Sequence, residues 1–256
     1  SFVELNSVSE KRKQIFDLCS RLNIKGLIIL SKEGINGTIA GEKKGVDFLI
    51  EQVGKMINRT DLNLKKSIAK KNPFGRMKVK VKEEIVTLGV AGLSNNDDAG
   101  IYVEPSDWNE LISNENMVTI DTRNDYEIAI GSFKGAINPK TENFSDFPGW
   151  WRANKDKFEG RSIAMFCTGG IRCEKSTKFL LKEGVKKVYH LKGGILNYLE
   201  KYKGPDSQWQ GECFVFDQRV SLSTNLKKGS CSLCFACRRP LTSDELSHPQ
   251  YEEGVS

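Results

Sequence analysis

The stretch of sequence that decides the fold is Ala164-Met165-Phe166-Cys167-Thr168-Gly169-Gly170-Ile171-Arg172-Cys173-Glu174. An apolar run from Ser162 to Phe166 ends at the cysteine, two glycines follow, and a helical pattern runs from Glu174 to Glu183. This order predicts a strand, a tight loop that holds a thiol, and the N-terminus of a helix. The backbone N–H groups of such a loop, the helix dipole and the charge of Arg172 all favour a thiolate. We therefore expect Cys167 to be a reactive nucleophile and not a buried core cysteine.

Strands alternate with helices around this stretch. The expected strands are 117–121, 162–166 and 187–191, and the expected helices are 174–183 and 195–202. The alternation predicts a parallel sheet with helices on both faces. Active sites of such sheets lie at the carboxyl ends of the strands, so Asp121 and Arg123 are candidates for the same crevice as Cys167. The favoured interpretation is a buried structural network, in which Asp121 caps a turn and Arg123 pairs with a carboxylate such as Glu127.

The first 92 residues follow a different pattern. They combine two amphipathic helices with short strands, expected at 8–22, 25–30, 38–40, 46–57 and 78–90. The pair Asn36-Gly37 predicts the turn of a hairpin between the first two strands. This succession predicts a small α+β domain of the ferredoxin-like type.

The spacing between Cys167 and Arg172 argues against one class of thiol enzyme. Cysteine phosphatases hold the phosphate oxyanion with Cys-x5-Arg, whereas this loop is Cys-x4-Arg and has Cys173 at the next position. The shorter loop suits a single sulfur or oxygen atom on the thiol better than a phosphate. Cys173 either resolves an oxidised Cys167 or packs in the first helical turn, and packing is the favoured interpretation.

Three segments resemble the signatures of a rhodanese domain, namely Asp121–Glu127, Gly131–Pro139 and Cys167–Arg172. The resemblance implies that Cys167 is the catalytic cysteine, which carries a persulfide in that family. The active-site loop then consists of Thr168, Gly169, Gly170, Ile171, Arg172 and Cys173. Phe133 stands where the family usually has His, and we assign it no catalytic role.

Longer motifs resemble one subfamily, the rhodanese-containing tRNA uridine hydroxylases. They are Glu33–Thr38, Lys71–Phe74, Asn138-Pro139, Glu142–Phe144, Phe147-Pro148, Cys167–Lys175 and His190–Tyr198. The resemblance implies oxygen-dependent conversion of the wobble uridine of certain tRNAs to 5-hydroxyuridine, with Cys167 essential and molecular oxygen as co-substrate. It adds no evident cofactor for catalysis.

The residues alone leave the chemistry at the Cys167 sulfur open. The thiolate adds to a uracil ring, or it passes through a sulfenic or persulfide state. A two-histidine iron site would need His190 and His248, the only histidines, which lie in different predicted regions. We therefore do not expect such a site.

On this basis we expect four regions. They are a basic ferredoxin-like α+β domain at 1–92, a polar linker at 93–104, an α/β rhodanese-like domain at 105–204 and a cysteine-containing region at 205–256.

Residues 65–82 contain seven Lys and one Arg but no acidic residue. Lys78, Lys80 and Lys82 alternate with apolar residues, so a strand would place them on one face. Such a stripe is typical of a surface that binds a phosphate backbone, and Phe74 is placed to stack on a base. The candidate RNA-binding residues are Lys65, Lys66, Lys70, Lys71, Phe74, Arg76, Lys78, Lys80 and Lys82. The alternative is the solvated outer face of a sheet.

Cys231, Cys234 and Cys237 are spaced as Cys-x2-Cys-x2-Cys. Cys234 and Cys237, with Cys231 as a further candidate, predict half of a structural zinc site. The segment from Cys234 to Leu241 resembles the first knuckle of some hydroxylases, whose second Cys-x2-Cys follows a Gly-Val-Ser like 254–256. We therefore expect a truncated knuckle, with zinc in the intact protein only. An iron–sulfur site is disfavoured because Leu241 stands where another cysteine is needed, and reduced thiols are the remaining alternative.

Composition sets the remaining expectations. The chain has 39 basic and 33 acidic residues, a net charge of +6, and seven cysteines, an odd number that fits reduced cytosolic thiols. It has no signal-like start and no run long enough to cross a membrane. We expect a cytoplasmic enzyme whose partner is tRNA and neither DNA nor a membrane. The alternatives are a sulfurtransferase that carries a persulfide on Cys167, and a non-catalytic RNA-binding module.

Overall fold

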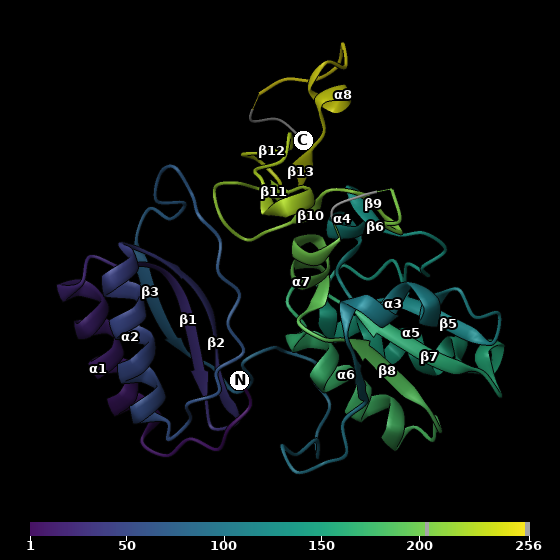
Figure 1. The fold of residues 1–256 in the computed structure, drawn as a ribbon, viewed down its shortest axis with the longest axis horizontal. Coiled ribbons are helices and arrows are strands. Elements are labelled where there is room, and N and C mark those ends of the chain that lie inside the picture. Colours follow the sequence, from purple (N-terminus) through teal and green to yellow (C-terminus); the bar gives the residue numbers. More distant parts are fainter. Residues whose placement is uncertain (203–204, 254–256) are drawn as a thin grey trace. The chain divides into compact units, whose positions relative to one another are not determined.

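The structure is a computed structural model that describes residues 1–202 and 205–253 (Figure 1). The chain divides into two compact units. Unit 1 comprises Ser1–Thr87 and Ser94–Asp97, and unit 2 comprises Leu88–Leu93 and Asp98–Ser256. No helix within the described ranges is both long and apolar enough to cross a lipid bilayer.

Unit 1 has a three-stranded sheet in the order β2-β1-β3. Its elements are α1 (Val8–Arg21), β1 (Lys25–Ser31), β2 (Gly34–Ala40), α2 (Lys43–Met56) and β3 (Met77–Val81). β1 is antiparallel to β2 and parallel to β3. An extended segment precedes α1, and there the N–H groups of Val3 and Leu5 donate to the carbonyls of Glu33 and Lys32. An extended segment, helix, two strands, helix and strand is the element order expected of a ferredoxin-like domain.

One face of this sheet is covered by the two helices (Figure 1). Ile28 and Leu30 of β1 and Val79 of β3 are buried in one apolar cluster with Ile15 of α1 and Leu49 of α2. Because side chains alternate along a strand, the neighbours of Val79 point to the other face. Those neighbours are Lys78 and Lys80, and both are exposed.

The hairpin of unit 1 turns at a different place from the one predicted. Ser31 pairs with Gly34, so the turn is formed by Lys32 and Glu33. Asn36-Gly37, the predicted turn, lies inside β2, and Gly37 pairs with Ile28. A Cβ atom at Gly37 would lie 2.3 Å from the Leu27 carbonyl oxygen. The glycine therefore permits close approach of two strands, and the turn prediction at this pair was wrong.

Unit 2 is built on a four-stranded parallel sheet in the order β4-β8-β7-β5. The strands are β4 (Ile101–Val103), β5 (Met117–Asp121), β7 (Ser162–Phe166) and β8 (Val188–Leu191). The helical elements are α3 (Pro105–Ile112), α4 (Asp125–Ile128), η1 (Phe144–Asp146), α5 (Phe147–Asn154), η2 (Lys155–Phe158), α6 (Ile171–Lys182) and α7 (Gly194–Lys201). Two of the predicted strands, β5 and β7, have the predicted bounds.

Helices cover both faces of this sheet. Ala164 and Phe166 of β7 pack in one cluster with Trp108 of α3 and Tyr198 of α7. Met165 between them points to the opposite face and is fully buried, so that face is covered as well. On that second side α5 contacts α6 through Phe147 and Phe179, whose ring centroids are 6.5 Å apart. The predicted α/β layering is confirmed.

The C-terminal part of unit 2 consists of short elements. They are β9 (Trp209–Gly211), β10 (Cys213–Phe214), β11 (Ser221–Leu222), η3 (Thr224–Leu226), β12 (Ser232–Leu233), β13 (Pro240–Leu241) and α8 (Ser243–Leu246). β9 pairs with β6 (Gly131–Phe133), and Trp209 packs in the same core as Phe133. This region is therefore anchored to the parallel-sheet core at its beginning. The stretch 93–104, expected to be a linker, contains β4, and the expected boundary at 204 lies outside the described residues.

Candidate active site

Cys167 directly follows β7, at the carboxyl end of the parallel sheet. The chain then turns at Gly170, whose φ of +95° is favourable only for glycine, and enters α6 at Ile171. The Gly170 N–H donates to the Cys167 sulfur at 3.1 Å. The helix dipole of α6 adds positive potential at the same place.

The surroundings of Cys167 favour its thiolate. Burial raises the pKa of this thiol. The hydrogen bond from the Cys173 thiol, the charge of Arg172 and the N–H groups of both residues outweigh burial and bring the pKa to about 6, from an ordinary value of 9.0. Because that pKa lies below neutral pH, Cys167 is mainly thiolate under physiological conditions.

Arg172 is held beside the loop by a buried carboxylate. Its two terminal nitrogens contact the two Glu127 oxygens at 2.5 and 3.0 Å, and Nη2 also reaches Thr168 Oγ1 at 3.3 Å. Glu127 is fully buried and Arg172 is 8% exposed. Burial opposes ionisation of Glu127, but the charge of Arg172 lowers the pKa of this carboxyl below its ordinary value. The pair fixes a cation close to the Cys167 sulfur.

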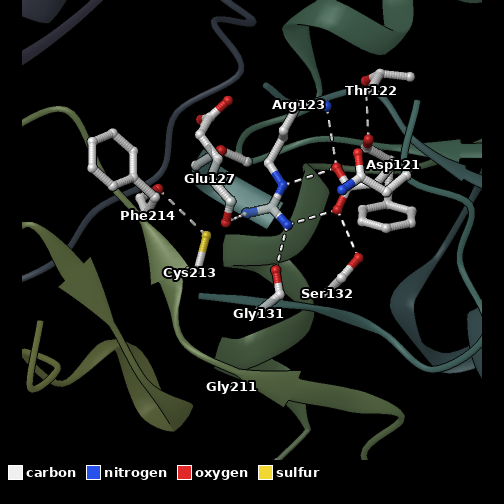
Figure 2. Close-up of polar contacts among 12 residues, drawn as sticks. Asp121, Thr122, Arg123, Glu127, Gly131, Ser132, Gly211, Cys213 and Phe214 are labelled. Carbon is white, nitrogen blue, oxygen red and sulfur yellow. Dashed lines mark hydrogen bonds and ion pairs between the residues drawn. The ribbon is translucent and has the colours of Figure 1, made fainter. Parts of the chain in front are cut away.

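Asp121 and Arg123 form a second buried ion pair, shown in Figure 2. The Arg123 Nε and Nη2 atoms donate to the Asp121 carboxylate at 2.9 and 2.6 Å, and Nη2 also donates to the Gly131 carbonyl at 2.6 Å. Ser132 Oγ donates to the same carboxylate at 2.7 Å. Neither side chain of the pair is exposed. These contacts support the structural interpretation of Asp121 and Arg123.

The carboxylate partner of Arg123 differs from the one suggested by the sequence. Glu127 offers Arg123 only its backbone carbonyl, at 3.2 Å from Nη1, and its carboxylate pairs with Arg172. Arg123 also lies over the ring of Trp209, 5.2 Å from its centroid. Asp121 caps its turn as expected, since its carboxylate accepts the Arg123 N–H at 3.1 Å.

The start of α7 supports the back of the cysteine loop. The Ile195 and Leu196 N–H groups donate to the Cys167 and Thr168 carbonyls at 3.0 and 3.1 Å. These donors of the first helical turn have no partner within the helix. A Cβ atom at Gly194, whose φ is +66°, would lie 2.4 Å from the Cys167 carbonyl oxygen. Sequence reasoning missed this role, although the pair Gly193-Gly194 after a strand was a visible signal.

Of the remaining loop residues, Gly169 and Ile171 are half-buried and Cys173 is fully buried. An added Cβ at Gly169 would meet nothing within 4 Å, and Ile171 is half-buried at the first position of α6. Cys173 is fully buried in the first turn of α6, with its sulfur 3.5 Å from Thr122 Oγ1. Phe133, which replaces the usual histidine, is 2% exposed. Its ring lies 4.8 Å from that of Phe166.

The candidate RNA-binding residues lie in unit 1. Residues 65–76 connect α2 to β3 without a helix or strand, and the lysines and Arg76 among them are exposed. Lys66 pairs with Asp47 at 2.8 Å, so part of the predicted charge is neutralised. Phe74 is half-buried. Lys78 and Lys80, on the helix-free sheet face, are the basic residues most clearly presented by regular structure.

Cys234 and Cys237 lie in the turn between β12 and β13. The backbone N–H of Cys237 and then that of Ala236 lower the pKa of the Cys234 thiol, a geometry suited to a metal-bound thiolate. The half zinc site at these two thiols stays a prediction. The Cys231 thiol contacts Ser221 and Glu212 instead. The described part of the chain holds no cluster of three or more metal-ligating side chains, and the predicted 254–256 motif lies outside it.

Comparisons with known proteins match both halves of the chain. The model of the UPF0176 acylphosphatase-like domain matches residues 1–85, and that of the rhodanese-like domain matches residues 104–201. A tRNA uridine(34) hydroxylase of Ruegeria pomeroyi is 51% identical over 255 residues, which is 100% of this chain and 85% of that protein.

Solved structures with rhodanese-like domains match part of the chain. A rhodanese-related protein from Thermoplasma volcanium is 22% identical, over 41% of this chain and 95% of that one, with a TM-score of 0.33. A rhodanese-like domain from Anabaena is 17% identical, over 43% of this chain and 78% of that one, with a TM-score of 0.35.

Proposed function

Because the chain belongs to the family of tRNA uridine(34) hydroxylases, we propose that it hydroxylates uridine 34 of tRNA to 5-hydroxyuridine, with Cys167 as the essential residue. The observation that carries this proposal is the 51% identity over the whole chain to a protein of that name. Molecular oxygen is the proposed co-substrate, and the cytoplasm is the proposed location because tRNA is the substrate.

The geometry around Cys167 supports its proposed role. The sulfur is a thiolate at neutral pH, receives the Gly170 N–H, and lies in the field of a fixed Arg172. Such a thiolate is competent to add to an electrophilic ring carbon or to cycle through oxidised sulfur states. The half zinc site at Cys234 and Cys237 would have a structural role, in which a bound metal holds the turn between β12 and β13.

The proposed tRNA contact is the helix-free face of the unit 1 sheet. Lys78 and Lys80 present two charges there, and each phosphate neutralised contributes to the salt dependence of binding. Lys78→Glu/Lys80→Glu is expected to weaken tRNA binding and to reduce the slope of log K against log salt by about two. The matched control is Lys13→Glu/Lys44→Glu, which reverses two exposed charges on α1 and α2. Equal effects of the two double variants would contradict this assignment.

The function is tested by mass spectrometry of the nucleosides of tRNA. Cells that lack the gene are complemented with the wild-type protein or with Cys167→Ser. Restoration of 5-hydroxyuridine by the wild type alone supports the proposal. Restoration of thiolated uridine instead would identify a sulfurtransferase. Full activity of Cys167→Ser would show that the Cys167 sulfur takes no part in the reaction.

A further inference from the structure

Two free thiols meet in the active-site loop. Cys167 precedes the loop and Cys173 lies in the first turn of α6, and both are buried, at 1% and 0% exposed. The Cys173 side chain and its backbone N–H lie close enough to the Cys167 sulfur to lower the pKa of that thiol. Thr122 Oγ1, which donates to the Phe166 carbonyl at 3.0 Å, lies 3.5 Å from the Cys173 sulfur on β5's side of the loop. The second thiol is therefore held against the first.

The two thiols differ in protonation. The pKa of Cys167 is lowered to about 6, whereas burial, the hydrogen bond to Cys167 and the charge of Cys167 raise the pKa of Cys173 well above its ordinary value. At neutral pH the pair consists of one thiolate and one thiol. A neighbouring thiolate and thiol are the two groups that a disulfide joins once two electrons are removed.

Hydroxylation of uridine by dioxygen consumes more electrons than the uridine supplies. One oxygen atom replaces the hydrogen at C5 of the uracil ring, and the other leaves as water. Dioxygen accepts four electrons in this change, and the C5–H bond supplies two of them. Two further electrons have to come from a reductant.

We propose that Cys167 and Cys173 supply these two electrons and become a disulfide in each turnover, an inference that rests on the proposed hydroxylation. One dioxygen, the uridine, the Cys167 thiolate, the Cys173 thiol and one solvent proton give 5-hydroxyuridine, water and one disulfide. The S–S and C5–O bonds form, and the Cys173 S–H, C5–H and O–O bonds break. The protons from C5, from Cys173 and from solvent are the three that complete the 5-hydroxyl group and the water. An external dithiol then reduces the disulfide by thiol–disulfide exchange.

The experiment is a single-turnover reaction of the full chain without an external thiol. The protein is reduced, freed of reductant and mixed with unmodified tRNA in air. Wild-type protein is expected to form one 5-hydroxyuridine per active site at most, and an equal amount of Cys167–Cys173 disulfide, located by peptide mass after free thiols are blocked. Added dithiothreitol is expected to restore multiple turnovers.

Cys173→Ser is expected to lose product formation in this reaction while its tRNA affinity is unchanged. The matched control is Cys19→Ser, because Cys19 is also a fully buried cysteine within a helix, α1 of unit 1. Unchanged tryptophan fluorescence shows that Cys173→Ser is folded, because all four tryptophans lie in unit 2 with Cys173. Product formed while both loop thiols stay reduced, or wild-type yield from Cys173→Ser, overturns the inference alone. No product from wild type with dithiothreitol and air overturns the proposed function and this inference with it.

Discussion

Arg172→Met is expected to change both the stability of unit 2 and the reactivity of Cys167. The guanidinium makes a two-point contact with the fully buried Glu127, and its charge lowers the pKa of the neighbouring thiol. The substitution keeps an unbranched apolar stem and removes the cation together with its hydrogen bonds to Glu127 and Thr168. It therefore leaves Glu127 buried without its partner.

The two effects have different sizes. Removal of one partner from a buried ion pair costs about 3–5 kcal/mol of unfolding free energy. Loss of a nearby opposite charge raises a pKa by about 1–3 units. About nine-tenths of Cys167 is thiolate at pH 7 when its pKa is about 6, against about one-hundredth at the ordinary value of 9.0.

Two assays read these effects separately. All four tryptophans lie in unit 2, so their fluorescence during denaturant unfolding reports on this unit. The pH dependence of alkylation of Cys167 by iodoacetamide gives the thiol pKa, with a midpoint near 6 in the wild type. Arg172→Met/Glu127→Gln is the control, because it removes both charges: stability is expected to recover in part, and the alkylation midpoint is expected to stay raised.

The reasoning is refuted by either of two results. If Arg172→Met loses less than about 1 kcal/mol, the contact with Glu127 is not a buried ion pair of ordinary strength. If the alkylation midpoint does not move, the loop N–H groups and Cys173 alone hold the thiolate.

The remaining predictions concern a glycine and a histidine. Gly194→Ala is expected to lower activity at least tenfold, because its Cβ would lie 2.4 Å from the Cys167 carbonyl oxygen. The control is Gly160→Ala, which has a similar φ (+74°) but open space around it and is expected to cost only about 1 kcal/mol of stability. An equal loss of activity in the two variants would contradict this prediction. Burial lowers the pKa of His190 to about 4 from 6.5. The unfolded chain thus binds the extra proton first, and stability is expected to fall by up to about 3 kcal/mol as pH drops from 6.5 to 4, a loss that His190→Gln should reduce in denaturant unfolding.

The local sequence pattern was sufficient to predict those elements of unit 2 whose structure depends on a single segment. The apolar runs at β5 and β7 end at a polar residue or a cysteine, so their bounds could be predicted. The start of α6 could not, because the Gly170 turn brings Ile171 into the helix three residues before the apolar pattern begins. The loop that holds Cys167 between β7 and α6 followed from that same segment.

The parts that sequence reasoning missed depend on pairing between distant segments. Glu127 was expected to pair with Arg123, but Arg172, distant in the chain, is its partner. The turn predicted at Asn36-Gly37 failed for a different reason, because the glycine lies inside β2 and permits the close approach of the neighbouring strand β1. Local propensity describes what a dipeptide tolerates, and the tertiary structure decides which of the tolerated uses is realised.

The contact between the cysteine loop and the start of α7 has a consequence for protein engineering. The carbonyls of Cys167 and Thr168 accept hydrogen bonds from backbone N–H groups of α7. Gly194 approaches these carbonyls so closely that a side chain would not fit there. A loop transplanted from another thiol enzyme, with one residue more, would displace those carbonyls from the helix. Exchange of the reactive loop therefore requires exchange of the glycine pair as well, so that the two motifs are transferred as a single cassette.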